Sequence, residues 1–548
     1  MSNLIKTHYS NIYILCSYNS NMNLDFLDIL EKIYKPFIAL DESQYEALGK
    51  LLLQERVSEI SFEMLGRILA IGKAYREYNK LPEPKVIEIE ENGRGEEKIV
   101  ILYETLTKHL ERKFAIVSYG GNPFVYVKGS YKDERKEIWS EARRLIEKQA
   151  GVKLDRKKIA EIEREVKARI IGDTYIRENP FNKLPPHKFV PVKNGVVLNL
   201  NGKRILLPSS PAWGFTYCLN VKYDETKDCP KIKQFIQSLI PKDHFILYEA
   251  IAAALLPVYQ YQGNYMLVGS GSNGKSTFLT LLRDFLGPEN VASISLQELV
   301  NNRFKPAELF GKLANIYADL PDEALRHTGI FKMLTGGDQI TVEKKYQHPF
   351  QFVNRARMYF SANVLPEVND ETYAFWRRWI VIEFPFQFDE NPNLIKEITS
   401  EDEKSGLLNI VLDTLNKIVE QGLTKTGLVE EMREKWRERS NPVYAFVKNC
   451  VTRDPNSFET KDEVYSAYVD FCNMKDLRVL PKNIFAMELQ RLIDVKTTRK
   501  KIAGQRVMCW EGIKLKCDEC ELYKECRSKG GEDEGDIDSL GGDQPFFA

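Results

Sequence analysis

The run Gly-Ser-Gly-Ser-Asn-Gly-Lys-Ser-Thr at residues 269–277 constrains the fold more than any other part of this chain. An apolar segment at 265–268 precedes it and a helix-like segment at 278–282 follows, so the pattern G-x-x-x-x-G-K-[ST] stands where a strand turns into a helix. There, glycines let the backbone turn tightly and aim N–H groups at phosphate oxygens, and the helix N-terminus adds partial positive charge. The sequence therefore predicts a nucleoside triphosphate site.

Within this loop, Lys275 is expected to reach the β- and γ-phosphates, and the Ser276 hydroxyl to complete the shell of a Mg²⁺ ion. The residues expected to contact the nucleotide are Gly269, Ser270, Gly271, Ser272, Asn273, Gly274, Lys275, Ser276 and Thr277.

Composition and charge restrict the class of protein. The chain has 548 residues, 43% apolar and 28% charged, with a net charge of zero, so any nucleic-acid binding must be local rather than spread over the whole surface. No run approaches the roughly 20 uninterrupted apolar residues of a membrane helix, and no export signal is apparent. With nine cysteines, five of them scattered, we expect a reduced, cytoplasmic protein that does not contact membranes.

Hydrophobic periodicity and polar breaks divide the chain into several predicted regions. Strands and helices alternate around the phosphate loop, as in an α/β nucleotide-binding core. The expected regions are a helical region at 1–82, helices with small strands at 98–235, the α/β core at 236–400, a helical linker or lid at 401–440, a small winged-helix-like α+β module at 441–514, a cysteine cluster at 515–528 and an acidic, disordered tail at 529–548.

A carboxylate follows the next apolar strand after the loop. Residues 313–318 are mostly apolar and end at Asp319, where an acid beside the phosphate loop can hold Mg²⁺ directly or through water. Glu323, and less favourably Asp322, could orient or deprotonate the attacking water. The alternative for Asp319 is that it only caps the strand.

Two further segments supply candidate residues. Residues 340–350 read as two short strands around a basic tip that would present Lys344, Lys345 and His348 to a phosphate backbone; a solvated hairpin without a role is the alternative. Residues 357–362 read as a strand ending at Asn363, which could bond the γ-phosphate or the water unless it is only a turn residue.

Two adjacent arginines, Arg377 and Arg378, precede another predicted strand at 380–384. An arginine presented to a neighbouring subunit's γ-phosphate neutralises charge in the transition state. We favour Arg378 for this role, and one of the two could instead form a structural ion pair.

These segments, in this order, resemble the superfamily 3 helicases, specifically the branch found in poxvirus, bacteriophage and archaeal-plasmid primase-helicases. The resemblance is carried by GSGSNGKST, KLANIYADLPDEAL, LTGGDQITVEKKY, FSANVLPEVND and FWRRW. A looser similarity, through FVYVKGSY and NGVVLNL, extends over residues 100–245, so about two thirds of the chain is covered.

The resemblance implies an AAA+-type core, a hexameric ring and 3′→5′ translocation on single-stranded DNA. It implies the same roles for Asp319, Lys345, Asn363 and the arginine pair. Many relatives also carry a primase domain, whose two-metal chemistry needs a close pair of acids on a strand. Asp25 and Asp28 lie on a predicted helix, so we expect no primase activity in this chain and a separate primase as a possible partner.

The carboxyl end carries two open questions. The 441–514 module has a basic turn between its last strands and could bind duplex DNA, contact a protein or be purely structural. Cys517, Cys520 and Cys526, with Cys509, could bind Zn²⁺ or an iron–sulfur cluster, remain free thiols or form a disulfide. The acidic tail ends in Gln-Pro-Phe-Phe-Ala and could recruit a replication partner or only aid solubility.

From the sequence we expect an ATP- and Mg²⁺-dependent DNA helicase of a virus or plasmid replication system. It would act as a homo-hexamer on single-stranded and forked DNA. Two alternatives stay open: a packaging or transposition ATPase that moves along duplex DNA, and an ATP-switched origin-binding or loading protein.

Overall fold

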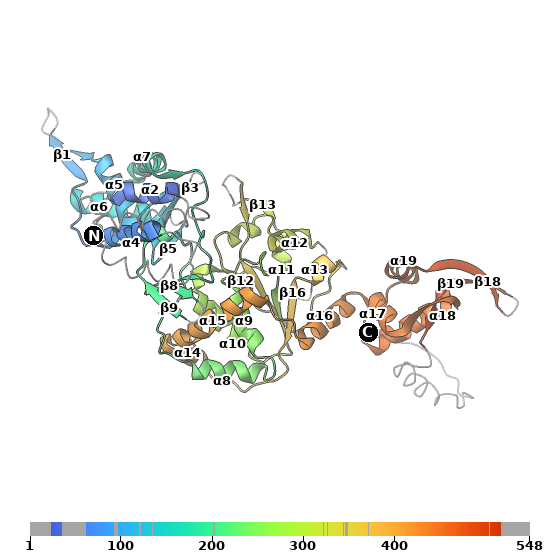
Figure 1. Cartoon of the computed structure of the whole chain (residues 1–548). Helices are drawn as coiled ribbons and strands as arrows, with labels where there is room; N and C mark the ends of the chain where they lie inside the picture. The colour runs from blue at the N-terminus through green and yellow to red at the C-terminus, as the bar shows by residue number, and fades with distance from the viewer. Residues whose placement is uncertain are drawn as a thin grey trace, which may run out of the picture. The chain divides into compact units, whose positions relative to one another are not determined.

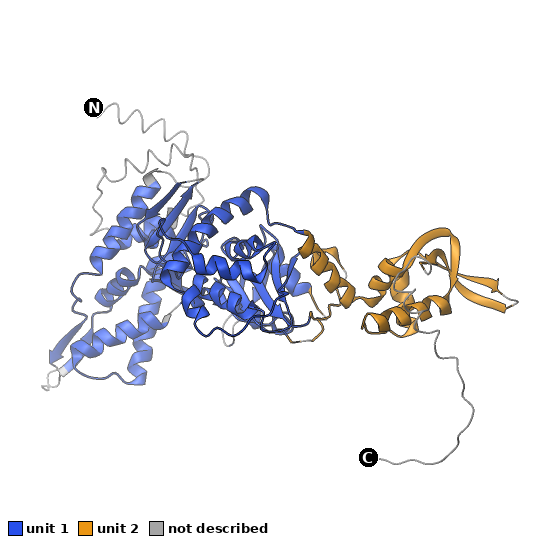
Figure 2. Ribbon diagram, turned by 90° about the horizontal axis from the view of Figure 1, so that it is seen from below, with its two compact units in different colours: residues 1–320, 329–364, 378–426 blue, residues 321–328, 365–377, 427–548 orange. Residues whose placement is uncertain are grey.

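The structure is a computed structural model of the chain. It describes residues 24–34, 62–91, 97–119, 122–133, 135–200, 203–321, 323–325, 327–343, 345, 349–370, 372–502 and 505–516. The chain forms two compact units, coloured separately in Figure 2. The first comprises 1–320, 329–364 and 378–426, and the second comprises 321–328, 365–377 and 427–548. The predicted 401–440 linker is thus shared between α15 (Glu401–Gln421) and α16 (Gly427–Ser440).

The first unit begins with helices and small strands, as the periodicity predicts. Its elements are α2 (Leu24–Tyr34), α4 (Phe62–Tyr78), β1 (Ile87–Glu91), β2 (Glu97–Ile101), α5 (Tyr103–Phe114), β3 (Val117–Tyr119), β4 (Asn122–Val127), β5 (Ser130–Lys132), α6 (Arg135–Ala150), α7 (Arg156–Thr174), β6 (Tyr175–Ile176), β7 (Phe189–Val192), β8 (Gly195–Leu200), β9 (Lys203–Leu207) and the 3₁₀ turn η2 (Pro211–Trp213).

Helix α7 shows how these elements form. The Asp155 carboxylate accepts a hydrogen bond from the Lys158 N–H and caps the helix, and Ile162, Val166 and Ile170 recur every four residues on its buried face. That face packs with α5 and α6 in one apolar cluster beside the sheet β5-β4-β3-β6.

The centre of the first unit is a five-stranded parallel sheet in the order β11-β12-β15-β10-β16, set among helices (Figure 1). Its strands and helices are α8 (Pro230–Leu239), α9 (Phe245–Ala253), β10 (Asn264–Val268), α10 (Lys275–Leu286), η3 (Pro288–Asn290), β11 (Val291–Ala292), α11 (Leu296–Asn301), η4 (Lys305–Leu309), β12 (Ala314–Tyr317), α12 (Gly329–Gly336), β15 (Arg357–Ala362), β16 (Trp379–Glu383) and α14 (Leu394–Ile398). A separate antiparallel pair, β13 (Gln339–Val342) and β14 (Phe350–Val353), forms the predicted hairpin strands. The mixed α/β class is as expected.

Arg357, the first residue of β15, is wholly buried. Its guanidinium donates to the carbonyl of Ala253 at the end of α9 (2.8 Å) and to those of Tyr261 (2.8 Å) and Gly263 just before β10. Burial lowers the pKa of Arg357, but an arginine stays charged in a protein. The side chain therefore ties the start of β15 to the chain that leads into β10.

The second unit contains a small α+β module. Its elements are α13 (Tyr373–Trp376), α16, α17 (Pro442–Cys450), β17 (Val451–Thr460), α18 (Lys461–Met474), α19 (Lys482–Leu492), β18 (Lys496–Ile502) and β19 (Gln505–Leu515). The strands form an antiparallel sheet in the order β17-β19-β18. A reciprocal capping box between Thr460 and Glu463 begins α18.

We predict that Arg357→Ala strongly destabilises the first unit. Three buried carbonyls would lose their donor, and each unsatisfied polar group costs about 1–3 kcal/mol, so the total loss is about 3 kcal/mol or more. Thermal unfolding measures this, with the exposed Arg164→Ala in α7 as the control that should shift the melting temperature little. Equal melting temperatures for the two variants would contradict the role given to Arg357.

Candidate functional site

The phosphate loop lies between β10 and α10, as the pattern requires. Gly271 and Gly274 have φ of 108° and 81°, and Gly274 immediately precedes the first residue of α10. The positive φ of Gly274 favours glycine, and a Cβ there would also lie 2.4 Å from the side chain of Leu239 in α8. A Cβ at Gly269 would lie 2.8 Å from the carbonyl oxygen of Phe384.

Asn273 and Ser272 tie the phosphate loop to the segment that follows β16. Its amide donates to the Phe384 carbonyl at 3.3 Å, and the Phe388 N–H donates to the Ser272 carbonyl at 2.8 Å. The segment that follows β16 thus supports the loop from outside. No motif in the sequence marks this segment, so it could not be recognised before the structure.

Lys275 is turned into the site and is nearly buried. Its ammonium donates to the Gly269 carbonyl at 2.6 Å and to the Asn273 side-chain oxygen at 2.8 Å, and lies 3.4 Å from the side-chain oxygen of Asn363. Burial lowers the pKa of Lys275, and the nearby Asp319 carboxylate opposes that shift. A positive charge is therefore held where the loop would place phosphates.

Asp319 and Asn363 meet the loop because their strands are neighbours. β12, β15 and β10 are adjacent and parallel, so the residues that follow them lie at one edge of the sheet. The Asn363 amide is 3.5 Å from the Asp319 carboxylate. Asp319 itself has φ of 60°, a left-handed conformation that non-glycine residues adopt mostly at turns and functional sites.

Ser361 supports that backbone. Its hydroxyl accepts a hydrogen bond from the Asp319 N–H at 3.2 Å, and its carbonyl accepts one from the Leu320 N–H at 2.8 Å. Ser361 also lines the site, although it reads in the sequence only as a strand residue.

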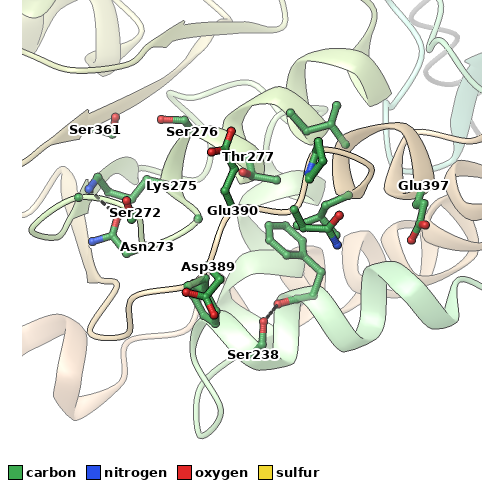
Figure 3. Close-up of a pocket in the computed structure, with 18 of the residues that line it drawn as sticks. Ser238, Ser272, Asn273, Lys275, Ser276, Thr277, Ser361, Asp389, Glu390 and Glu397 are labelled. Carbon is green, nitrogen blue, oxygen red and sulfur yellow. Dashed lines mark hydrogen bonds between the residues drawn. The ribbon is translucent and has the colours of Figure 1, made fainter.

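A pocket of about 990 Å³ opens over the loop, large enough for a nucleotide. Figure 3 shows the loop residues on one side and residues of α8 and the segment before α14 on the other. The predicted residues that line it are Gly271, Ser272, Asn273, Gly274, Lys275, Ser276, Thr277, Asp319 and Asn363. Gly269 and Ser270 do not line it; the Ser270 hydroxyl lies 3.4 Å from the Gln387 amide.

The wall of the pocket formed by α8, α14 and the segment before α14 was not expected from the sequence. Phe235 and Ser238 of α8 line the pocket together with Phe388 and Ile395, and Lys231 forms an ion pair with Glu397 at 3.1 Å. These segments flank the loop in space but carry no spacing pattern, so their part in the pocket depends on the tertiary fold.

Ser276 and Asp319 are the residues that could hold Mg²⁺. Among the described residues there is no group of three or more His, Cys, Asp or Glu side chains that could hold a metal alone. That donor set suits Mg²⁺, which is usually bound by one or two carboxylates together with substrate phosphates and water.

Glu323 lies in segment 321–328, which belongs to the second unit, and it does not line the pocket. Its role with water stays a prediction. Asp322 lies outside the described residues.

The two adjacent arginines differ in burial. Arg378 is 7% exposed, and its guanidinium donates to the Thr335 hydroxyl at 3.1 Å, whereas Arg377 is exposed. The Arg378 carbonyl also accepts the Asn264 N–H at 2.7 Å, which joins the start of β16 to β10. This burial favours Arg377 over Arg378 for any contact with another subunit, which reverses the expected choice.

The basic hairpin is partly described. β13 and β14 pair over four residues each, and Phe310 packs edge-on against Phe350 and Phe352 of β14. The Lys345 ammonium lies 5.9 Å from the centre of the Phe304 ring. Lys344 and His348 lie outside the described residues, so their predicted contacts with a phosphate backbone stay predictions.

Of the four cysteines in the predicted cluster, only Cys509 is described. It is wholly buried in β19, and its thiol lies 3.7 Å from the Val507 carbonyl. Cys517, Cys520 and Cys526 lie outside the described residues, as does the acidic tail. The Zn²⁺ or iron–sulfur site therefore gains no support from the described part of the chain.

Family comparisons agree with these motifs. Residues 102–241 match a model described as D5 N terminal like, residues 438–515 match one described as Poxvirus D5 protein-like, and residues 267–378 match a family of unknown function, DUF5906. In these matches the chain is similar to viral helicases of the superfamily 3 type. Among described residues, no helix is long and apolar enough to cross a membrane.

Two curated relatives support this placement. "Putative helicase L207/L206" of Acanthamoeba polyphaga mimivirus is 26% identical over 303 residues, covering 48% of this chain and 32% of that protein. "Putative helicase V13" of Sputnik virophage is 23% identical over 296 residues, covering 48% of this chain and 36% of that protein. The chain thus spans about one third of the length of these relatives.

Two solved structures are similar at low identity. The C-terminal region of NrS-1 in its apo form is 12% identical with a TM-score of 0.40, covering 72% of this chain and 95% of that one. A JCV helicase with a bound small molecule is 16% identical with a TM-score of 0.22, covering 39% of this chain and 63% of that one.

We predict that Asp319→Asn removes most of the Mg²⁺-dependent affinity for ATP. The amide cannot supply the negative charge of the carboxylate, and loss of a supporting group at a metal site costs about tenfold or more in affinity. Binding of a fluorescent ATP analogue, titrated with and without Mg²⁺, measures it. Asp494→Asn, outside the pocket, serves as the control, and equal Mg²⁺ dependence in both variants would refute the assignment.

Proposed function

We propose that this chain is the ATP-driven motor of a DNA replication helicase of viral or plasmid type, working as a ring of identical subunits. The observation that carries the proposal is the row formed by Lys275, Asn363 and Asp319 across the ends of three adjacent parallel strands. The family matches and the two viral relatives support a helicase rather than another nucleotide-binding protein.

The residues of the pocket suit hydrolysis of a nucleoside triphosphate. Lys275 and the N–H groups of the loop neutralise and orient the phosphates. Bound Mg²⁺, held by Ser276 and Asp319, would supply further positive charge at the β- and γ-phosphates. Asn363, which contacts Lys275 and Asp319, is proposed to respond to the γ-phosphate. Glu323 is proposed to take a proton from the water whose oxygen attacks the γ-phosphorus as the bond to ADP breaks.

The pocket also supports an assembly of several copies. Among the described residues that line it, Lys231 and Lys275 are the cations, and no arginine is present. Lys231 is already paired with Glu397. The charge that develops during phosphoryl transfer is usually countered by an arginine. We propose that Arg377 of a neighbouring copy supplies it, in an AAA+-type hexamer.

The β13–β14 hairpin is proposed to grip single-stranded DNA. Its tip carries Lys345, and cations on a loop can hold a phosphate backbone without reading bases. Movement of this hairpin with the ATP state would pull the strand through the ring.

We predict that the chain unwinds forked DNA with ATP and that Lys345→Ala abolishes unwinding while basal ATP hydrolysis continues. Removing one cation weakens the grip on the strand but leaves the nucleotide pocket intact. Strand displacement from a labelled fork measures this, with the exposed Lys242→Ala as control. Movement along intact duplex without strand separation would indicate a translocase, and slow ATP hydrolysis insensitive to DNA would indicate a loading switch; either result overturns the helicase proposal.

We predict that Arg377→Ala lowers ATP turnover about a thousandfold, because an arginine supplied in trans contributes roughly that much to phosphoryl transfer. Mixing Arg377→Ala with Lys275→Ala chains should restore turnover, since each supplies the half-site that the other lacks. Arg378→Ala serves as the comparison and should lower thermal stability instead. Failure of the mixture to recover activity would place Arg377 outside the shared site.

A further inference from the structure

Helix α8 begins without a cap from its own segment. In the described part of the chain, Cys229 before the helix makes no side-chain hydrogen bond to it, and Pro230 at its first position has no N–H. The next two N–H groups, of Lys231 and Ile232, lie in the first turn and so have no acceptor within the helix. Both donate to the Glu403 carboxylate, at 3.3 and 3.0 Å. The cap of α8 thus comes from α15, far along the chain.

The first half of α15 also holds the segment that leads into α8. Glu403, Gly406 and Asn409 follow at intervals of three residues and so lie along one side of α15. A Cβ at Gly406 would lie 2.3 Å from the carbonyl carbon of Asp228, so the two backbones come closer than a side chain at this position would allow. The Asn409 amide donates to the Lys227 carbonyl at 3.1 Å. Several contacts therefore fix the start of α8 against α15.

The residue after Glu403 contacts a different helix. The Lys404 ammonium lies 2.8 Å from the Asp284 carboxylate, which belongs to the last turn of α10. Lys404 is 5% exposed and Glu403 is 7% exposed, so both charges are buried. Helix α10 begins at the phosphate loop, whereas α8, α14 and α15 pack against one another in the first unit (Figure 1).

The two helices held in this way carry residues on the two sides of the pocket (Figure 3). α8 contributes Phe235 and Ser238, and α10 contributes Lys275. Among the described residues that line the pocket, neither Glu403 nor Lys404 is present. They can therefore act on the pocket only through the helices that they hold.

The burial of two opposite charges side by side in α15 is unfavourable unless each has a partner. Apolar side chains of similar size would pack α15 at lower cost. However, hydrogen bonds to charged groups and ion pairs fix distance and direction more narrowly than apolar contacts do. Adjacent buried charges that each hold a different helix therefore indicate placement rather than packing.

We propose that Glu403 and Lys404 are positioning residues that set the spacing of α8 and α10, and with it the affinity of the pocket for a nucleoside triphosphate. Loss of either contact lets one side of the pocket move away from the other, which weakens binding of the nucleotide in the ground state and the transition state alike. Such a loss raises KM and leaves kcat nearly unchanged. The inference rests on the proposed function, because it takes the pocket as the site of ATP binding and hydrolysis.

The test measures ATP hydrolysis by the full chain over a range of ATP concentrations, with Mg²⁺ present. Glu403→Ala should raise KM about tenfold with kcat within about twofold of the parent, because two hydrogen bonds to a charged group are lost. Glu403→Gln keeps an acceptor oxygen for one N–H, so its KM should lie between those of the parent and Glu403→Ala. Lys404→Met should raise KM about threefold, a smaller effect because Asp284 is 34% exposed and water can solvate it.

The matched control is Glu401→Ala, in the same turn of α15. The Glu401 carboxylate also accepts a backbone N–H, that of Lys222 at 2.9 Å, and pairs with Lys193 at 3.1 Å. Neither of these partners is among the described residues of the pocket. Glu401→Ala should therefore keep the KM of the parent, and thermal melting should show that each variant is folded at the assay temperature.

A second variant perturbs the contact with α8 without removing a charge. The Cβ introduced by Gly406→Ala must displace the backbone at Asp228 and with it the start of α8, so KM should rise about threefold or more. This variant and Glu403→Gln decide the question if Glu403→Ala does not fold.

A KM like that of the parent in Glu403→Ala or in Lys404→Met, or an equal rise in Glu401→Ala, would overturn the proposal. If Glu403→Ala does not fold, an unchanged KM in both Glu403→Gln and Gly406→Ala would do the same. A parent chain that hydrolyses ATP beside such unchanged variants would refute this inference alone. A parent chain that neither binds nor hydrolyses a nucleoside triphosphate would refute the proposed function, and this inference with it.

Discussion

The buried guanidinium of Arg357 determines how β15 lies against β10, and the site at the ends of those strands depends on that placement. Three backbone carbonyls from two separate segments converge on one charged group. A displaced or missing donor would leave them unsatisfied in the interior. Since strand registers propagate along their length, this contact at the beginning of β15 also sets the position of Asn363 just beyond its end.

The site is built mainly from residues that follow strands rather than from residues within them. Backbone conformation there is not regular, and Asp319 adopts a left-handed angle that Ser361 supports through its hydroxyl. The cost of that conformation is of the order of 1–3 kcal/mol, which the surrounding contacts must offset. Its benefit is that the carboxylate points toward the loop instead of continuing the direction of β12.

The phosphate loop, Asp319 and Asn363 could be predicted because each is a local pattern: a glycine-spaced turn or a polar residue after an apolar strand. The β13–β14 strands were predictable for the same reason. The far wall of the pocket was not, because Phe235 and Ile395 come together only in the folded chain. The arginine pair shows the same limit. Arg377 and Arg378 are adjacent in the sequence but differ in burial at the start of β16. Only the contact with Thr335 shows that Arg378 is the buried one.

The contacts of Lys275 have a consequence for the shape of the phosphate loop. Its ammonium already has the Gly269 carbonyl and the Asn273 side chain as acceptors, and Asn273 is itself anchored to Phe384. Contacts within the protein itself therefore hold the loop, and a loop held in this way would lose little ordering entropy when phosphates replace these acceptors. If the chain hydrolyses ATP as proposed, such a loop would keep its shape from one nucleotide to the next without refolding.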